Sequence, residues 1–322
     1  MQFSTGGHLV VRITPDDVGK RVSVRTLAGP GEHPARFTDT VGLLSSWNGG
    51  VLVVLRRDGR VARLSESGLV AGKVVPPGPA AGVAELTAAG ARSWPAPEAE
   101  RIGGWLARAA GGWTRRANSA LPVGRDLPDL ERIAAWYAAR GLPALLHVVE
   151  GSAAEREAAA RGWAPEAHAV VQVAPLAPLA GLGAEGPAAE VRLLREPDGE
   201  WLRGWPRAGE APEAARKVLA GGPATLFALV PGGEGAPAAV GRCVVDGRFA
   251  GLSAMRVDPG RRREGLGTAV LAALARAALA EGAETAHLQV EADNDPARAL
   301  YASLGFAAHH RYHYRVAPGA GG

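Results

Sequence analysis

MRVDPGRRREGLGTAVLAALARAALAEGAETAHLQVEADNDPARALYASLGF, residues 255–306, is the stretch that decides the fold of this chain. It predicts a strand at 251–257 that stops at a strong turn signal, Asp258-Pro259-Gly260, and then a helix over 268–281. A second strand follows at 287–291, and the next helix ends at Gly305, which suits the position after a helix C-terminus. Strands and helices are therefore expected to alternate around a glycine-rich loop.

The loop before the first helix predicts a binding site for a phosphate. Gly265 and Gly267 lie where the helix begins, and glycine lets the backbone come close to a ligand. The unpaired N–H groups of the first helical turn and the helix dipole both favour an anion there. No Gly-Lys-Ser/Thr sequence follows, so the loop is not of the Walker type.

Two motifs in this stretch resemble those of the GCN5-related N-acetyltransferases (GNAT family). The first is R-x-x-G-x-G at Arg262, Gly265 and Gly267, and the second is N-x-x-A-x-x-L-Y-x-x-x-G-F from Asn294 to Phe306. The resemblance implies an α+β fold, acetyl-CoA as cosubstrate and no metal. It also implies that Arg262 adds charge to a pyrophosphate cradle formed by the backbone of Arg263, Gly265, Leu266, Gly267 and Thr268.

The resemblance assigns further roles around the coenzyme. Met255 and Val257 would pair their backbone with the pantetheine arm as a strand does, while the Met255 side chain is equally suited to core packing. Asn294 would contact the pantetheine or position a water; a simple role at the helix start is the alternative.

Two residues are candidates for the chemical step. Tyr301 matches the family's general acid, because a phenol stays protonated at neutral pH, although a core tyrosine would look the same in sequence. Glu291 is the best carboxylate for a general base, with a water relay and a merely solvated strand end as alternatives. His309, His310 and His313 are not expected to bind a metal, since strand geometry places His310 on the face opposite the other two.

An earlier part of the chain, residues 95–175, repeats the same order of elements. Helices are expected at 98–110 and 127–140 and strands at 113–120, 144–149 and 167–173, with Gly162-Trp163 in the place of Gly305-Phe306. The first copy has the acidic sequence GRDLPD, 124–129, where the second has its glycine loop, so we expect only residues 188–317 to bind coenzyme. The chain is interpreted as tandem GNAT-like units, the first degenerate.

The N-terminal residues 1–76 predict a small all-β module. Five runs, 20–27, 37–47, 50–57, 60–64 and 69–75, are separated by turn signals such as Asn48-Gly49 and Asp58-Gly59. The pattern resembles an SH3-like barrel, typical of scaffold or partner contacts, with nucleic-acid contact as the alternative. A barrel followed by tandem units resembles an actinobacterial group named histone-acetyltransferase-like.

Composition is that of a globular protein, with 47% hydrophobic and 21% charged residues among 322. A net charge of +4 is modest and argues against a nucleic-acid partner, and one cysteine, Cys243, allows no disulfide within the chain. No apolar run suits a membrane span, which favours a cytoplasmic location. Two hypotheses follow: an acetyltransferase acting on a primary amine of a small molecule or protein, or an acetyl-CoA-sensing, partner-binding module. The acceptor and the oligomeric state stay open.

Overall fold

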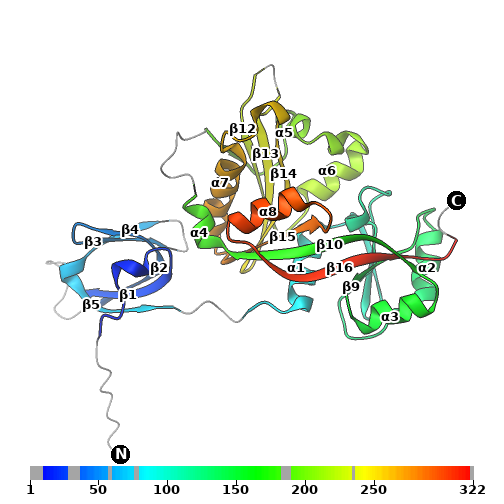
Figure 1. Cartoon of the computed structure of the whole chain (residues 1–322), viewed down its shortest axis with the longest axis horizontal. Coiled ribbons are helices and arrows are strands. Elements are labelled where there is room, and N and C mark those ends of the chain that lie inside the picture. The colour runs from blue at the N-terminus through cyan, green and yellow to red at the C-terminus, as the bar shows by residue number, and fades with distance from the viewer. Residues whose placement is uncertain are drawn as a thin grey trace, which may run out of the picture. The chain divides into compact units, whose positions relative to one another are not determined.

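The computed structural model describes residues 10–27, 37–56, 60–75, 80–182, 190–233 and 236–319. The chain forms two compact units, one of residues 1–80 with 279–282 and one of residues 81–278 with 283–322 (Figure 1). Residues 76–79, three prolines and a glycine, lie outside the described residues. In the part of the chain that is described, no helix is both long and apolar enough to cross a lipid bilayer.

The N-terminal unit contains an antiparallel sheet in which the five predicted strands are present. Their order is β4-β3-β2-β1-β5, with bounds Val61–Ser65, Val51–Arg56, Phe37–Asn48, Arg21–Leu27 and Leu69–Val74. Alternate residues point into a small core, where Val22, Leu44 and Leu52 are fully buried. The described residues of β4 and β5 do not pair with each other, so closure into an SH3-like barrel stays a prediction.

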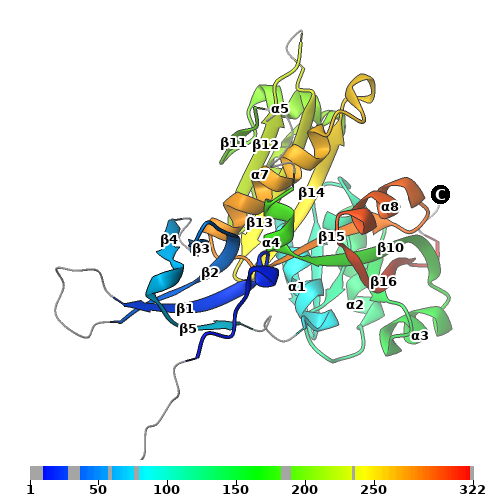
Figure 2. The same ribbon diagram turned by 60° about the vertical axis from the view of Figure 1, so that its left-hand side comes forward.

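The second unit is built on a mixed sheet of eight strands in the order β11-β12-β13-β14-β15-β10-β16-β9 (Figures 1 and 2). Their bounds are Arg192–Leu194, Ala224–Val230, Ala239–Asp246, Phe249–Val257, Thr285–Glu291, Ala164–Pro175, Ala307–Val316 and Leu145–Val149. A small sheet of β6 (Glu98–Ile102), β7 (Trp105–Ala109) and β8 (Leu121–Pro122) adjoins β9 through a bridge between Ala120 and Leu146. Strands of both predicted repeats therefore lie in one unit.

The two repeats exchange their last strands. β15 of the second repeat pairs with β10 of the first, and β9 of the first pairs with β16 of the second. β10 and β16 also pair with each other, side by side at the centre of Figure 1. Ala169 of β10 lies opposite Glu291 of β15, and Tyr312 of β16 lies in the same way opposite Val149 of β9. This correspondence gives the unit an approximate internal two-fold symmetry.

Helices cover both faces of the sheet. Their bounds are α1 Val83–Ser93, α2 Leu130–Ala138, α3 Ala153–Ala160, α4 Leu176–Ala180, α5 Gly199–Gly204, α6 Pro212–Ala220, α7 Leu266–Ala280 and α8 Asp295–Ser303. Gly241 of β13 faces α7, because a Cβ added there would lie 2.6 Å from the Val270 side chain. The next residue, Arg242, faces the opposite side and donates to the carbonyl of Ser93 at the end of α1. α7 and α1 therefore lie on opposite faces.

The predicted helix over 98–110 is wrong, because this stretch forms the hairpin of β6 and β7. Gly103 turns the hairpin with a φ of 57°, a left-handed conformation that glycine adopts easily. Trp105, Ala107 and Ala109 are buried with the two-residue period of a strand. The apolar residues of this stretch fit a helical spacing by coincidence, and cross-strand pairing decides the outcome.

The strand predicted at 113–120 is also wrong, and α1 was not anticipated. A 3₁₀ turn, η3 (Arg115–Ala117), occupies the stretch, and the side-chain oxygen of Asn118 accepts from the backbone N–H groups of Ala110 and Gly112. α1 packs tightly on the sheet through Gly90, where a Cβ would lie 2.7 Å from the Gln289 amide. The other elements predicted in the second unit are present within a few residues.

Candidate active site

β14 and β15 form an opening in the middle of the sheet. The two strands pair in parallel only where Phe249–Gly251 lies against Thr285–His287, and they diverge after that (Figure 2). The β15 side of Leu252–Val257 therefore has backbone N–H and C=O groups without a strand partner among the residues that the structure describes. Such an edge can add an extended, amide-containing ligand as a further strand. Met255 and Val257 lie on this edge, and the pairing of their backbone with the pantetheine stays a prediction.

A bulge distorts β14 at the opening. The β13–β14 register shifts between Val240 and Arg242, and Ala254 has a φ of 52°, which is uncommon for a residue with a side chain. The Met255 sulfur packs toward β13, since a Cβ on Gly241 would lie 2.6 Å from it. The half-buried Met255 side chain thus packs on the α7 face of the sheet, which leaves its backbone for a ligand.

The loop after β14 has the conformation that its glycines predict. Arg263 and Gly265 both have positive φ values, 66° and 77°, and a Cβ on Gly265 would meet no atom within 4 Å. A Cβ on Gly267 would lie 3.3 Å from the Val257 side chain, so this glycine lets α7 begin close to β14. The space above Gly265 is open to a ligand at the N-terminus of α7.

Charge around this loop is positive. Arg261 forms an ion pair with Glu264 at 2.7 Å and lowers the pKa of that carboxyl. Arg262 and Arg263 are exposed and have no ion-pair partner among the described residues. Two uncompensated guanidinium groups therefore flank the open N–H groups of α7, which suits a polyanionic ligand.

α8 lies at the same end of the opening as the glycine loop. This is because β14 and β15 run parallel, the loop follows β14, and α8 follows β15. Asn294 caps α8, its Oδ1 accepting from the Ala297 N–H at 3.2 Å. Tyr301 is half-buried, and its ring packs edge-to-face on Phe306 at 5.6 Å. Burial raises the pKa of Tyr301, so the phenol stays protonated at neutral pH.

Glu291 is the last residue of β15. Its backbone pairs with Ala169, and its exposed side chain makes no hydrogen bond or ion pair with the described residues. Every second side chain of β15 points to the α1 face of the sheet, and these are His287, Gln289 and Glu291. Gln289 accepts a hydrogen bond of 2.7 Å from the Tyr312 hydroxyl, so it is held in place beside Glu291.

The apex of the opening contains residues that sequence reasoning missed. A cavity about the size of one water molecule is lined by Ser93, Trp94 and Arg116 on one side and by β14 and β15, including His287, on the other. The Arg116 guanidinium lies 5.4 Å from the centre of the Trp94 ring, and its buried Nε has no hydrogen-bond partner within the described segments. A cationic side chain from the N-terminal half of this unit thus reaches the apex.

His287 and Arg242 both contact Ser93, one of the residues that line this apex. Burial lowers the pKa of His287 to about 4, so the ring is neutral, and its Nε2 lies 3.5 Å from the Ser93 hydroxyl. Arg242 is fully buried, and burial lowers its pKa to about 9. Its guanidinium donates to carbonyl oxygens at the ends of two helices: Ser93 of α1, and Leu219 and Gly221 at α6. Helix C-termini carry partial negative charge, so they stabilise this cation without a carboxylate.

The corresponding place in the first repeat is filled by the chain itself. Gly124 lies so close to the β6–β7 turn that a Cβ would meet Gly104 Cα at 3.0 Å. The Asp129 side chain accepts from the Arg132 N–H and caps α2. The residues that replace the glycine loop are therefore used in packing and capping.

The fold and this opening define a GNAT N-acetyltransferase. A solved structure described as a GCN5-related N-acetyltransferase from Kribbella flavida has the same fold, with a TM-score of 0.55 at 18% identity, over 74% of this chain and 97% of that one.

Residues 80–315 match the family described as "Probable histone acetyltransferase Rv0428c C-terminal", and the chain belongs to this family. It is 31% identical over 321 residues to the probable histone acetyltransferase Rv0428c of Mycobacterium tuberculosis, covering 94% of this chain and 97% of that protein. It is 29% identical over 236 residues to the uncharacterized N-acetyltransferase YobR of Bacillus subtilis, covering 70% and 95%.

Proposed function

We propose that the chain transfers the acetyl group of acetyl-CoA to a primary amine of a small molecule or protein. The observation that carries the proposal is the unpaired edge of β14, which leads into a loop with open N–H groups and two uncompensated arginines. A long, amide-containing chain that ends in a pyrophosphate matches this sequence of features. Acetyl-CoA is such a ligand, and it supplies the acyl group activated as a thioester.

Each part of the coenzyme is assigned to residues of the second repeat. The backbone of Arg263 to Thr268 and the Arg262 side chain bind the pyrophosphate. The backbone of Met255 and Val257 binds the pantetheine amides as an added strand. Asn294 uses its oxygen to cap α8, which leaves its NH₂ group for the pantetheine or a water. The packed residues around Gly124 argue against a second coenzyme site in the first repeat.

Transfer requires two proton movements once the amine attacks the thioester carbonyl and the C–S bond breaks. Tyr301 donates its phenolic proton to the departing thiolate, and its raised pKa keeps the phenol protonated until the transfer. The proton lost by the amine goes to Glu291, directly or through a water, since this carboxylate is exposed and has no partner among the described residues. His287 is not assigned as the base, because its buried ring already lies against Ser93.

The acceptor is assigned to the side of the opening formed by α5 and α6. A hollow of about 400 Å³ lies there, lined by Leu202, Pro206, Pro212 and Arg216 among others. Arg256 of the unpaired β14 edge donates to the Gly204 carbonyl at the end of α5, so the hollow is tied to the opening. Its size suits a small amine or the side chain of a protein substrate.

Steady-state release of free CoA against a panel of amines, measured with wild type and Tyr301→Phe, tests the proposal. We expect turnover with at least one amine, and a kcat for Tyr301→Phe that is about 10²- to 10⁴-fold lower at unchanged coenzyme affinity. A thermal melt of the variant checks the fold, since only a hydroxyl is removed. Tight acetyl-CoA binding without turnover on any amine would favour the sensing module instead, and turnover within about twofold of wild type would remove Tyr301 from the mechanism.

A further inference from the structure

His313 of β16 is a buried imidazole that faces the Glu155 carboxylate at 3.4 Å without forming a hydrogen bond to it. Its exposed fraction is 1%, and neither ring nitrogen has a hydrogen-bond partner in the described part of the chain. An unused nitrogen in a buried position is costly unless something else binds it.

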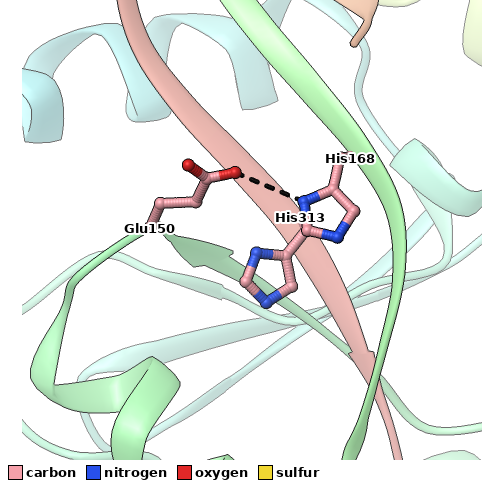
Figure 3. A group of neighbouring side chains, drawn as sticks. All are labelled: Glu150, His168 and His313. Carbon is pink, nitrogen blue, oxygen red and sulfur yellow. Dashed lines mark hydrogen bonds and ion pairs between the residues drawn. The ribbon is translucent and has the colours of Figure 1, made fainter. Parts of the chain in front are cut away.

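Two exposed side chains converge on this ring (Figure 3). His168 of β10 lies with its ring centre 4.7 Å from that of His313, and its Nδ1 is 3.3 Å from Glu150 Oε1. One ligand atom from each of these three residues lies within 4.8 Å of the other two. They come from three segments that only the strand exchange brings together, the turn after β9, the bulge of β10 and the middle of β16.

We propose that Glu150, His168 and His313 bind one divalent transition-metal ion, with Zn²⁺ as the representative. Two imidazoles and a carboxylate are a ligand set that Zn²⁺ prefers. Zn–N distances of about 2.0–2.1 Å place tetrahedral ligand atoms roughly 3.4 Å apart, a spacing that His168 and Glu150 already have. The fixed His313 completes the set when the two exposed side chains turn toward it. The site lies away from the coenzyme loop and does not depend on acetyl transfer.

A second carboxylate stands beside the buried ring. Glu155 of α3 places its Oε1 3.4 Å from His313 Nε2. Carboxylates in this position orient the histidines of many metal sites or enter the coordination sphere themselves. The ion would therefore join α3, β10 and β16 where the two repeats cross.

Two arginines compensate the carboxylates in the absence of a cation. Arg311 lies 3.3 Å from Glu150, and Arg315 lies 3.5 Å from Glu155. The Arg311 side chain is 52% exposed, so it can swing into solvent when a cation takes its place. Removal of Arg311 should therefore strengthen metal binding, because the ion no longer competes with a guanidinium.

The fold itself does not require these side chains. Across the internal two-fold symmetry, the backbone bond from Glu150 N–H to the Arg311 carbonyl corresponds to the bond from Ala292 N–H to the His168 carbonyl. Ala292 is therefore the symmetry equivalent of Glu150, and Arg311 is the equivalent of His168. The ligand set occurs on one side of the symmetry axis only, so it is a feature of this sequence and not of the strand crossing.

Calorimetric titration of the untagged, chelator-treated full chain with ZnCl₂ tests the site, with visible absorption of the Co²⁺ form as a second readout. We expect one ion per chain, at least about tenfold weaker binding in His168→Ala and Glu150→Gln, and tighter binding in Arg311→Ala. Both ligand variants alter exposed side chains, and thermal melts without metal verify their folding.

His309→Ala is the matched control, because His309 and His310 form a separate pair with their Nδ1 atoms 2.8 Å apart. Its affinity should equal that of wild type. Absence of saturable Zn²⁺ binding would overturn the proposal. Equal affinity in wild type and His168→Ala, or loss of binding in His309→Ala, would also overturn it, since the ion would then lie elsewhere.

Discussion

An aspartate at Gly265 should abolish coenzyme binding while leaving the fold intact. The position has a φ of 77° and no neighbour within 4 Å, so the protein pays only the left-handed backbone strain, about 1 kcal/mol or less for aspartate. The new carboxylate would stand in the proposed pyrophosphate cradle. A like charge at about 4 Å costs roughly 4 kcal/mol near a protein surface, and each 1.4 kcal/mol is about tenfold in affinity. We expect the Kd for acetyl-CoA to rise about a thousandfold.

Gly247 offers a matched control for this experiment. It has a φ of 56°, equally open space around its Cβ, and a place in the turn before β14, at the end opposite the loop. Gly247→Asp should show the same small change in melting temperature and an unchanged Kd. Calorimetric titration with acetyl-CoA measures the Kd of both variants. If Gly265→Asp binds within threefold of wild type while folded, the loop does not bind the pyrophosphate and the coenzyme assignment fails.

Three further predictions concern the apex and its support. If the acceptor reaches from the hollow at α5 and α6 to the apex that Arg116 lines, Arg116→Ala should raise the KM for the acceptor about tenfold at unchanged acetyl-CoA affinity; an unchanged KM in steady-state kinetics would exclude contact between Arg116 and the acceptor. His287 has its pKa depressed from 6.5 to about 4, so its neutral form stabilises the fold above pH 6.5 and this contribution is lost as pH falls toward 4. His287→Gln should remove about 2 kcal/mol of the stability difference between pH 8 and pH 5 in denaturant titrations, and equal pH dependence in both proteins would refute the assignment. Arg242→Lys should lower the free energy of unfolding by about 2–4 kcal/mol, since an ammonium cannot donate to the carbonyls of both α1 and α6; a melt identical to wild type would contradict this.

Local signals in the sequence were sufficient for the elements around the coenzyme loop. Turn residues, glycines at helix ends and the two motifs placed β14, α7, β15 and α8 within a few residues. The same signals failed at 98–110, where apolar spacing fits a helix but Gly103 and cross-strand pairing make a hairpin. α1 was not predicted because Val83 and Leu86 are its only large apolar residues, and Gly90 inside the helix lets it pack closely on the sheet.

The parts of the site that could not be predicted are those assembled over long sequence distances. Arg116 of the first repeat and Trp94 at the end of α1 reach the apex from far away in the sequence, and nothing in their local sequence indicates a partner on β15. His313 was interpreted only against its neighbours in sequence, whereas its close contacts are His168 and Glu155. Such contacts follow from the strand exchange, which leaves no periodic signal in the sequence.

The exchange of β10 and β16 also determines when the eight-stranded sheet can be completed during synthesis of the chain. β9 and β10 leave the ribosome early, yet each keeps one edge unpaired until β16, the last strand described, has been made. Unpaired edges attract other chains, so the nascent protein carries an aggregation risk for nearly the whole time of translation. A polypeptide that stops short of Ala307 would lack a strand that belongs to both repeats at once. Premature termination or C-terminal proteolysis would therefore disable the first repeat as fully as the second, however complete its own sequence.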